Sequence, residues 1–186
     1  MDTVPGVATT MMQTAQAEVR RIYVGGSIGQ VYAGLAWLAS AAVWWLVGPT
    51  PAIAVLLVTG FFLYPVTTGV SRLLGSPGSI PPSNPLRPLG LTAPIAGALG
   101  LPVALAASLQ REEWFFPAMM IVMGAHYLPF WPLYGMWLFV PLGAGMWVTG
   151  VVVALWLPSL AVSAAALTGL ALVGVGVVAW VRHARS

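Results

Sequence analysis

Six long apolar stretches follow one another along the chain, separated by segments rich in proline, glycine or charge. A helix needs about 20 mostly apolar residues to cross the ~30 Å hydrocarbon core of a bilayer. The fourth stretch is short because Pro129 and Pro132 interrupt it, which predicts a short or kinked helix. The pattern predicts an all-α fold, a single polytopic transmembrane bundle over residues 1–186. The predicted spans are 23–47, 52–70, 89–109, 114–128, 135–157 and 160–181.

Two polar segments fall outside these spans. Residues 1–21 are polar or weakly apolar and end in Glu18-Val19-Arg20-Arg21. An interfacial helix and a disordered tail both fit that segment. Residues 71–88 contain five prolines and four serines. An irregular backbone of this kind would leave amide groups unpaired in lipid, so we predict a loop on the cytoplasmic side of the membrane.

The composition supports a membrane location. The chain is 59% hydrophobic and only 6% charged, whereas a soluble domain carries about 25% charged residues. The expected partner is therefore the lipid bilayer. Although the net charge is +3 and the isoelectric point about 9.8, the seven arginines form no basic stripe, and we exclude nucleic acid as a partner.

The arginines also predict an orientation, because Arg and Lys near helix ends favour the cytoplasmic side. If the N-terminus lies inside, the outer segments contain only Arg111, next to two glutamates. Both termini are then cytoplasmic in a multi-pass protein of the bacterial inner membrane. The six arginines on the cytoplasmic side are Arg20, Arg21, Arg72, Arg87, Arg182 and Arg185.

Small residues recur every four positions on the first and last predicted helices, a spacing that lets helix backbones approach closely in lipid. They can serve packing within the chain or a homo-oligomer interface, and the sequence leaves both open. The residues are Gly25, Gly29, Ala33, Ala161, Ala165 and Gly169.

One candidate site depends on His126, the only ionisable side chain within a predicted span apart from tyrosines. An ionisable group in a membrane is by default a functional hypothesis, and histidine can relay protons near neutral pH. The alternative is a neutral imidazole bonded to a carbonyl freed by a nearby proline. At ~1.5 Å per residue, five other polar residues share its depth, and a common face would make a pocket for a small molecule or ion. These are Gln30, Tyr64, Thr67, Tyr127 and Tyr134.

Catalytic and cofactor motifs are weak. Gly25-x-Ser27-x-Gly29 matches the pattern of a nucleophile elbow, but that motif needs a strand before the turn and a helix after it. The chain has no cysteine, no histidine cluster, no carboxylate pair within a span and no phosphate-binding glycine loop. We therefore expect no metal, no cofactor and no catalytic constellation.

One part of the chain resembles a known family. Trp114-Phe115-Phe116-Pro117, then the segment from Gly124 to Phe130 that reads Gly-Ala-His-Tyr-Leu-Pro-Phe, then Tyr134-Gly135, together resemble a signature of a family of small bacterial membrane proteins of unknown function. The resemblance implies six helices and draws attention to the Gly-Ala-His-Tyr-Leu-Pro-Phe segment. It implies no activity.

The favoured function is a small transporter, channel or hydrophobic-ligand-binding protein that works through the layer around His126. The alternative is a non-catalytic assembly subunit that packs through its small-residue faces, and an intramembrane enzyme ranks third.

Overall fold

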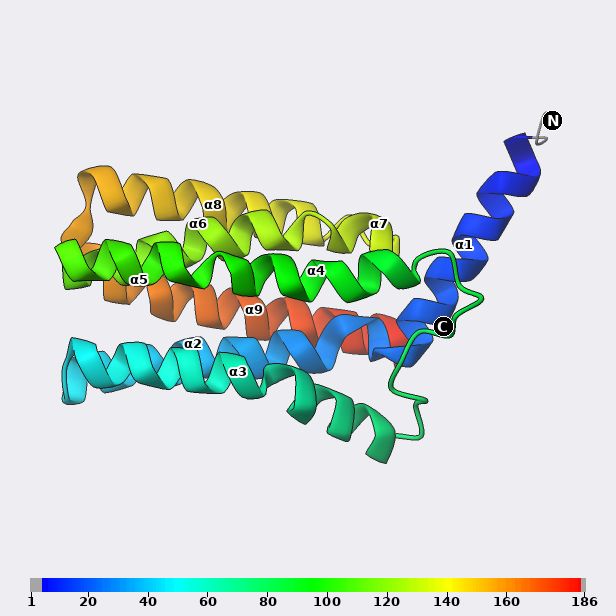
Figure 1. Cartoon of the computed structure of the whole chain (residues 1–186), viewed down its shortest axis with the longest axis horizontal. Coiled ribbons are helices and arrows are strands. Elements are labelled where there is room, and N and C mark those ends of the chain that lie inside the picture. Colours follow the sequence, from blue (N-terminus) through cyan, green and yellow to red (C-terminus); the bar gives the residue numbers. More distant parts are fainter. Residues whose placement is uncertain (1–4, 185–186) are drawn as a thin grey trace.

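A computed structural model describes residues 5–184, which fold into helices joined by short turns and one longer loop over 74–86 (Figure 1). The all-α prediction is confirmed, since this range contains no strand. The α-helices are α1 (Pro5–Ile22), α2 (Ser27–Leu46), α3 (Pro49–Leu73), α4 (Arg87–Leu99), α5 (Leu101–Gln110), α6 (Phe115–Tyr127), α7 (Phe130–Tyr134), α8 (Phe139–Trp156) and α9 (Ala161–Ala184). Three short 3-10 turns accompany them: η1 (Val24–Gly26), η2 (Glu112–Trp114) and η3 (Pro158–Leu160).

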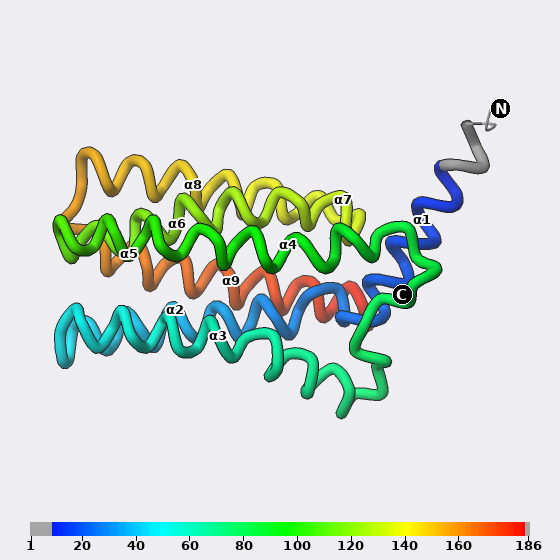
Figure 2. The backbone as a smooth tube through the Cα atoms, viewed as in Figure 1, coloured from blue at the N-terminus to red at the C-terminus, as the bar shows by residue number. Residues whose placement is uncertain are grey.

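The long helices run side by side along the long axis of the molecule, and α1 projects from one end (Figures 1 and 2). That end also contains the 74–86 loop, α7 and the end of α9. We call it the Arg-rich end, because five described arginines lie there. The far end contains the α2–α3, α5–α6 and α8–α9 turns. The five arginines are Arg20, Arg21, Arg72, Arg87 and Arg182.

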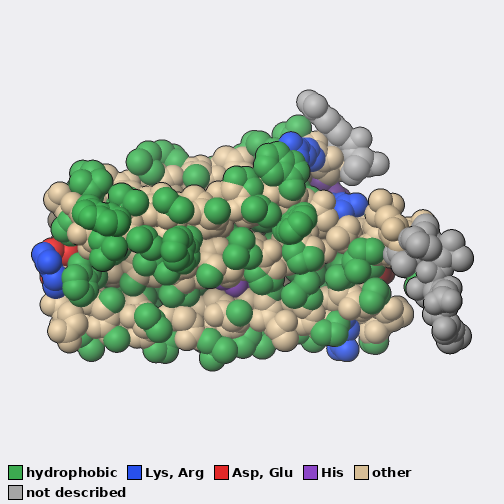
Figure 3. Space-filling view, turned by 90° about the horizontal axis from the view of Figure 1, so that it is seen from above, with side chains coloured by type: hydrophobic (Ala, Val, Ile, Leu, Met, Phe, Trp, Pro, Cys, Tyr) green, Lys and Arg blue, Asp and Glu red, His purple; other side chains and the backbone are tan. Residues whose placement is uncertain are grey.

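Charge is concentrated at the two ends of the bundle. In the space-filling view, basic and acidic side chains meet at the far end and further basic side chains lie at the opposite end, with an apolar surface between them (Figure 3). The far-end charges are Arg111, Glu112 and Glu113, and Arg111 forms an ion pair with Glu113. This distribution is typical of a bundle whose middle contacts lipid.

Four helical segments are long and apolar enough to cross a membrane: Pro49–Leu73, Arg87–Gln110, Phe139–Trp156 and Pro158–Ala184. They correspond to the predicted second, third, fifth and sixth spans. The helix α6 has only 13 residues, and α2 has 20 residues but contains the buried polar side chains Ser27, Gln30 and Ser40. The six-span count therefore stays a prediction for these two helices.

Helix boundaries differ from prediction where backbone chemistry intervenes. The first predicted span begins at Tyr23, but α2 begins at Ser27. Val24, Gly25 and Gly26 have φ values of 51°, 64° and 79°, a left-handed conformation that ends α1 and turns the chain. The predicted third span is divided at Gly100 into α4 and α5, because Pro102 lacks the N–H that would continue the helix.

The core contains two closely packed helix pairs, α2 with α9 and α6 with α8. A Cβ on Gly34 would lie 2.6 Å from the Gly169 carbonyl oxygen, and one on Gly169 would lie 2.8 Å from the Gly34 oxygen. We call this contact the α2–α9 seam. Gly124 and Gly143 face each other in the same way, since a Cβ on either would lie 2.6 Å from the carbonyl oxygen of the other, and they form the α6–α8 seam.

The small residues singled out in the sequence lie in different surroundings. Ala161, Ala165 and Gly169 are buried within α9. A Cβ on Gly29, however, would have nothing within 4 Å, and Gly25 belongs to η1 rather than to a helix; Ala33 is only partly buried. The packing face of α2 runs through Ser27, Gln30, Gly34, Trp37 and Ala41.

Polar contacts attach the helix α1 to the Arg-rich end. Of the two alternatives for residues 1–21, a helix or a disordered tail, the described residues from Pro5 onwards form the helix. Asn84 donates to the Ala15 carbonyl at 3.1 Å and to Glu18 at 2.7 Å. The Gln16 side chain donates to the Pro132 carbonyl at 2.8 Å, and Arg20 donates to the Tyr134 carbonyl. These bonds hold α1 against both the 74–86 loop and α7.

Candidate functional site

His126 lies in the last turn of α6 and faces α4. A Cβ on Gly97 would lie 3.0 Å from its Nδ1 atom, so the imidazole occupies the space that this glycine leaves open. The Ala93 backbone, one turn earlier on α4, also interacts with the ring. Nδ1 itself is buried and has no hydrogen-bond partner within residues 5–184. His126 is therefore packed against α4 through its Nδ1 side, while the residue as a whole is only partly buried.

An aromatic cluster surrounds this position at the Arg-rich end of α6, α7 and α8. The ring centroids of His126 and Phe130 are 4.9 Å apart, and those of Tyr134 and Phe139 are 5.4 Å apart. Tyr127 and Phe139 are nearly parallel, 6.4 Å apart. The rings fill the space between these helices. The cluster consists of His126, Tyr127, Phe130, Tyr134 and Phe139.

Gln30 reaches this cluster from α2. Its side chain hydrogen-bonds that of Tyr127, and both residues are buried. Like His126 Nδ1, the Gln30 Oε1 atom is buried without a hydrogen-bond partner among the described residues. Gln30, Tyr127, Tyr134 and His126 thus lie in one region, although His126 points towards α4 and Tyr127 towards α2.

The two predicted residues on α3 lie elsewhere. The Tyr64 side chain is 54% exposed. The Thr67 hydroxyl donates to the Leu63 carbonyl of its own helix at 2.7 Å, so it offers no free donor to a ligand. Sequence reasoning missed Tyr23, whose phenol lies within electrostatic range of those of Tyr64 and Tyr134. It sits in the turn before α2, which the prediction treated as helix.

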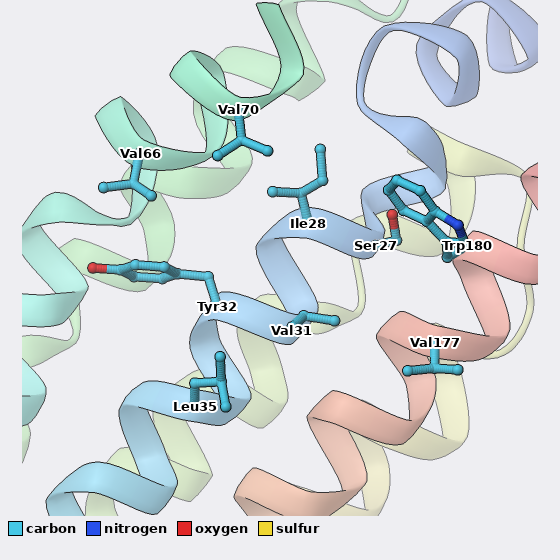
Figure 4. Close-up of a pocket in the computed structure, with 9 residues that line it drawn as sticks. All are labelled: Ser27, Ile28, Val31, Tyr32, Leu35, Val66, Val70, Val177 and Trp180. Carbon is cyan, nitrogen blue, oxygen red and sulfur yellow. The ribbon is translucent and has the colours of Figure 1, made fainter. Parts of the chain in front are cut away.

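A groove between α2, α3 and α9 was also missed. Its volume is about 400 Å³, and the surface that lines it is apolar. Figure 4 shows side chains from all three helices around it. Its outward opening is evident from the exposure of Leu35 (56%) and Val177 (51%). The lining residues are Ser27, Ile28, Val31, Tyr32, Leu35, Val66, Val70, Val177 and Trp180.

The groove exists because α3 is fixed to α2 along only part of its length. Near the far end, the Ser40 hydroxyl donates to the Ala52 carbonyl at 2.7 Å and the Tyr32 hydroxyl donates to the Thr59 carbonyl at 3.0 Å. Pro65 then interrupts the hydrogen bonding of α3, and an internal proline bends a helix. Beyond it, α3 diverges from α2 (Figure 1). Pro65 was the sequence signal for the groove.

Catalytic chemistry finds no further support. The Ser27 hydroxyl donates to the Val24 carbonyl at 2.7 Å, a local bond at the start of a helix rather than a contact with a base. Among the residues that the structure describes, no group of three or more His, Asp or Glu side chains could hold a metal ion.

Long apolar helices, charge confined to the ends and a groove open to the side together define a helical membrane protein. The chain belongs to a family of unknown function, DUF7010, which matches residues 12–183. No curated protein and no solved structure matches it.

Proposed function

We propose that this chain crosses the membrane six times with both termini in the cytoplasm, and that it binds a hydrophobic ligand in the groove between α2, α3 and α9. The groove itself carries the proposal, because the surface that lines it is apolar. Ligand sites of about 300–1,000 Å³ lined mainly by apolar side chains are typical of small-molecule binding, and this groove falls within that range.

The opening of the groove selects the class of ligand. Leu35 and Val177 are exposed on the side of the bundle, where the proposed topology places lipid tails. A ligand that enters sideways from the bilayer meets apolar side chains on three helices. We therefore propose a ligand with a flexible hydrocarbon chain, held by dispersion contacts.

The cluster around His126 has a supporting role in this proposal. None of His126, Tyr127 or Tyr134 lines the groove. Gln30 lies on the first turns of α2, close in sequence to the groove residues Ile28 and Val31. Its bond to Tyr127 ties the α2 wall of the groove to α6. A transport or proton-relay role for this layer would require a path to the groove through α2.

An experiment on the purified full-length chain tests ligand binding. Ile28→Phe with Val70→Phe fills the groove, and Val148→Phe, on the exposed face of α8, adds a comparable ring elsewhere. We expect lipid extract added to delipidated protein in detergent to raise the Tm of the native chain and of Val148→Phe by several degrees. The double variant should show less than half that rise. Equal rises in all three proteins would overturn the proposal.

A second candidate function, membrane assembly, is supported by the exposure of α3. Only 6% of its apolar membrane-spanning segment is buried inside the protein. The small-residue face of α9 packs against α2 within the chain, so α3 is the better surface for a partner helix. In this case the native chain would copurify with a partner that Phe61→Ser releases, and added lipid would leave its Tm unchanged.

A further inference from the structure

We infer that the ligand of the groove is an anionic phospholipid from the leaflet at the Arg-rich end, with one acyl chain in the groove and the phosphate at its mouth. The inference rests on the proposed function and names the ligand of the same site. Three features carry it: the length of the groove, the side chain at its mouth and the charge around that mouth.

The length of the groove fits one leaflet. On α2 it extends from Ser27 to Leu35, which lie eight positions apart and are therefore separated by ~12 Å along the helix at ~1.5 Å per residue. Half of the hydrocarbon core is about 15 Å thick. On α3 the groove uses Val66 and Val70, one turn apart, in the half of the helix beyond Pro65. The groove therefore spans one leaflet only, at the Arg-rich end.

The mouth of the groove is marked by Trp180. Its indole ring lines the groove near Ser27 (Figure 4) and is 45% exposed. Tryptophan is enriched at the level of lipid headgroups, where its ring packs on hydrocarbon and its N–H finds a polar partner. Trp180 lies four residues before the end of α9, which places it where the ester groups of a phospholipid would lie.

The charge around the mouth is positive. The two walls that flank it, α3 and α9, end in basic turns that contain Arg72 and Arg182. The stem of Arg72 packs near Gly78 of the 74–86 loop, which keeps the guanidinium at this end of the bundle. Both arginines are exposed, and their long side chains can turn towards a phosphate at the mouth.

These arginines have no acidic partner among residues 5–184. The ion pair in that range joins Arg111 to Glu113 at the far end. The carboxylate of the Arg-rich end, Glu18, accepts a hydrogen bond from Asn84. An anionic headgroup would supply the missing counter-charge. Each basic residue near a membrane surface favours an anionic over a neutral lipid by about fivefold in affinity.

The test uses the fluorescence of Trp180 in the full-length chain. Bromine atoms on an acyl chain quench a tryptophan that they contact. The chain is placed in phosphatidylcholine vesicles that contain increasing fractions of brominated phosphatidylglycerol, and in a parallel series brominated phosphatidylcholine. The same measurement on Trp180→Phe, subtracted, isolates the Trp180 signal from that of the other tryptophans.

We expect quenching of Trp180 by brominated phosphatidylglycerol to reach half of its maximum at a mole fraction at least fivefold lower than with brominated phosphatidylcholine. Arg72→Gln and Arg182→Gln should each reduce this preference severalfold. The matched control is Arg87→Gln, which removes the same charge at the same end, on α4 and away from the groove. It should leave most of the preference intact.

The other outcomes separate the two proposals. Equal quenching by both lipids, abolished by the groove-filling Ile28→Phe with Val70→Phe, would overturn the inferred preference for an anionic lipid. It would leave the proposed binding of a hydrophobic ligand in place. If Arg87→Gln, Arg72→Gln and Arg182→Gln all lost the preference for phosphatidylglycerol equally, overall surface charge would explain that preference. This result would also overturn the inference. Quenching unaffected by filling the groove would overturn the proposed function itself.

Discussion

The α2–α9 and α6–α8 seams both pack two helices closely through facing glycines, but their surroundings differ at the Arg-rich end. In both, two glycines face each other so closely that a Cβ added to either would lie within 2.8 Å of the other's carbonyl oxygen. Beside the α6–α8 seam, the aromatic cluster around Phe139 fills the space. Beside the α2–α9 seam, α3 bends away at Pro65 and leaves a groove.

This difference separates two uses of a helix pair in a membrane. Where rings fill the space, polar atoms such as His126 Nδ1 are buried against protein and stay away from any ligand that enters sideways. Where a third helix bends away, apolar side chains such as Leu35 are left open to lipid. The polar residues that attract attention in the sequence and the surface that can take a ligand are consequently in different places.

The largest effect is expected from the glycines that both seams share. Gly34→Leu would place a side chain against the Gly169 backbone, and Gly124→Leu against the Gly143 backbone, neither of which can move aside alone. Overpacking typically costs about 1–3 kcal/mol and occasionally more, and contact with backbone on both sides places these two positions at the upper end. We expect each variant to elute as aggregate in size-exclusion chromatography in detergent, with no cooperative thermal transition.

Gly29→Leu and Gly145→Leu are matched controls, because nothing lies within 4 Å of a Cβ at either position. Both should elute as the native chain does and unfold within a few degrees of it. If Gly29→Leu were as damaging as Gly34→Leu, the packing face of α2 would be the predicted one and the assignment of the seam to Gly34 would be wrong.

An intermediate effect is expected at the boundary of the groove. The chain has no cysteine, so Ile28→Cys with Val70→Cys introduces a unique pair across it. Because Pro65 leaves the end of α3 unsupported, we expect that end to swing towards α2 when the groove is empty, so that an oxidant joins the two thiols. Bound phosphatidylglycerol should slow the reaction about tenfold, as measured by gel mobility with and without reductant.

Ser40→Cys with Ala52→Cys gives the comparison, since the Ser40 hydroxyl already lies 2.7 Å from the Ala52 carbonyl in the fixed half of α3. Its rate of oxidation should not depend on lipid. A groove pair that never reacts, with or without lipid, would show that the bent half of α3 is rigid.

Much of the fold was accessible from the sequence because lipid imposes a simple rule on helices that contact it. The four segments long and apolar enough to span a membrane coincide with predicted stretches. The rule weakens for interior helices, where neighbouring protein replaces lipid: α2 buries Gln30 and Ser40. The break at Gly100 and the left-handed turn at Gly25–Gly26 depend on local backbone conformation, which hydrophobic pattern does not report.

For the candidate site, the sequence predicted the depth of the side chains along their helices but not the directions in which they point. The rise per residue placed Gln30, Tyr127 and His126 at one level, and they lie near one another. The direction of a side chain depends on which face of its helix meets a neighbour, and spacing alone did not distinguish Gly29, which has nothing within 4 Å of a Cβ, from Gly34, which contacts α9. Pro65 indicated a bend, but only the packing of α2, α3 and α9 shows that the bend opens a groove.

The smallest effect, and the most specific, concerns His126 and Gly97 on the filled side of the molecule. A Cβ on Gly97 would lie 3.0 Å from His126 Nδ1, so Gly97→Ala requires the ring to shift, and we expect it to destabilise the chain by about 1 kcal/mol. In a His126→Ala background the same change meets open space. Alanine is then favoured over glycine in a helix by up to about 1 kcal/mol. The effect of Gly97→Ala on the free energy of unfolding should therefore change sign and become stabilising.

The four proteins of this cycle are the native chain, the two single variants and the double variant. Their unfolding in a denaturing detergent, monitored by tryptophan fluorescence, gives the coupling free energy between the two positions. Residues in contact typically couple by about 0.5–3 kcal/mol. Gly60→Ala on α3, where nothing lies within 4 Å, measures the gain from helix propensity alone and should stabilise in both backgrounds. If His126→Ala does not fold, His126→Asn provides a smaller planar side chain for the same cycle. An identical effect of Gly97→Ala in both backgrounds would mean that the imidazole does not occupy this space, and the division between a filled half and an open half of the bundle would lose its clearest evidence.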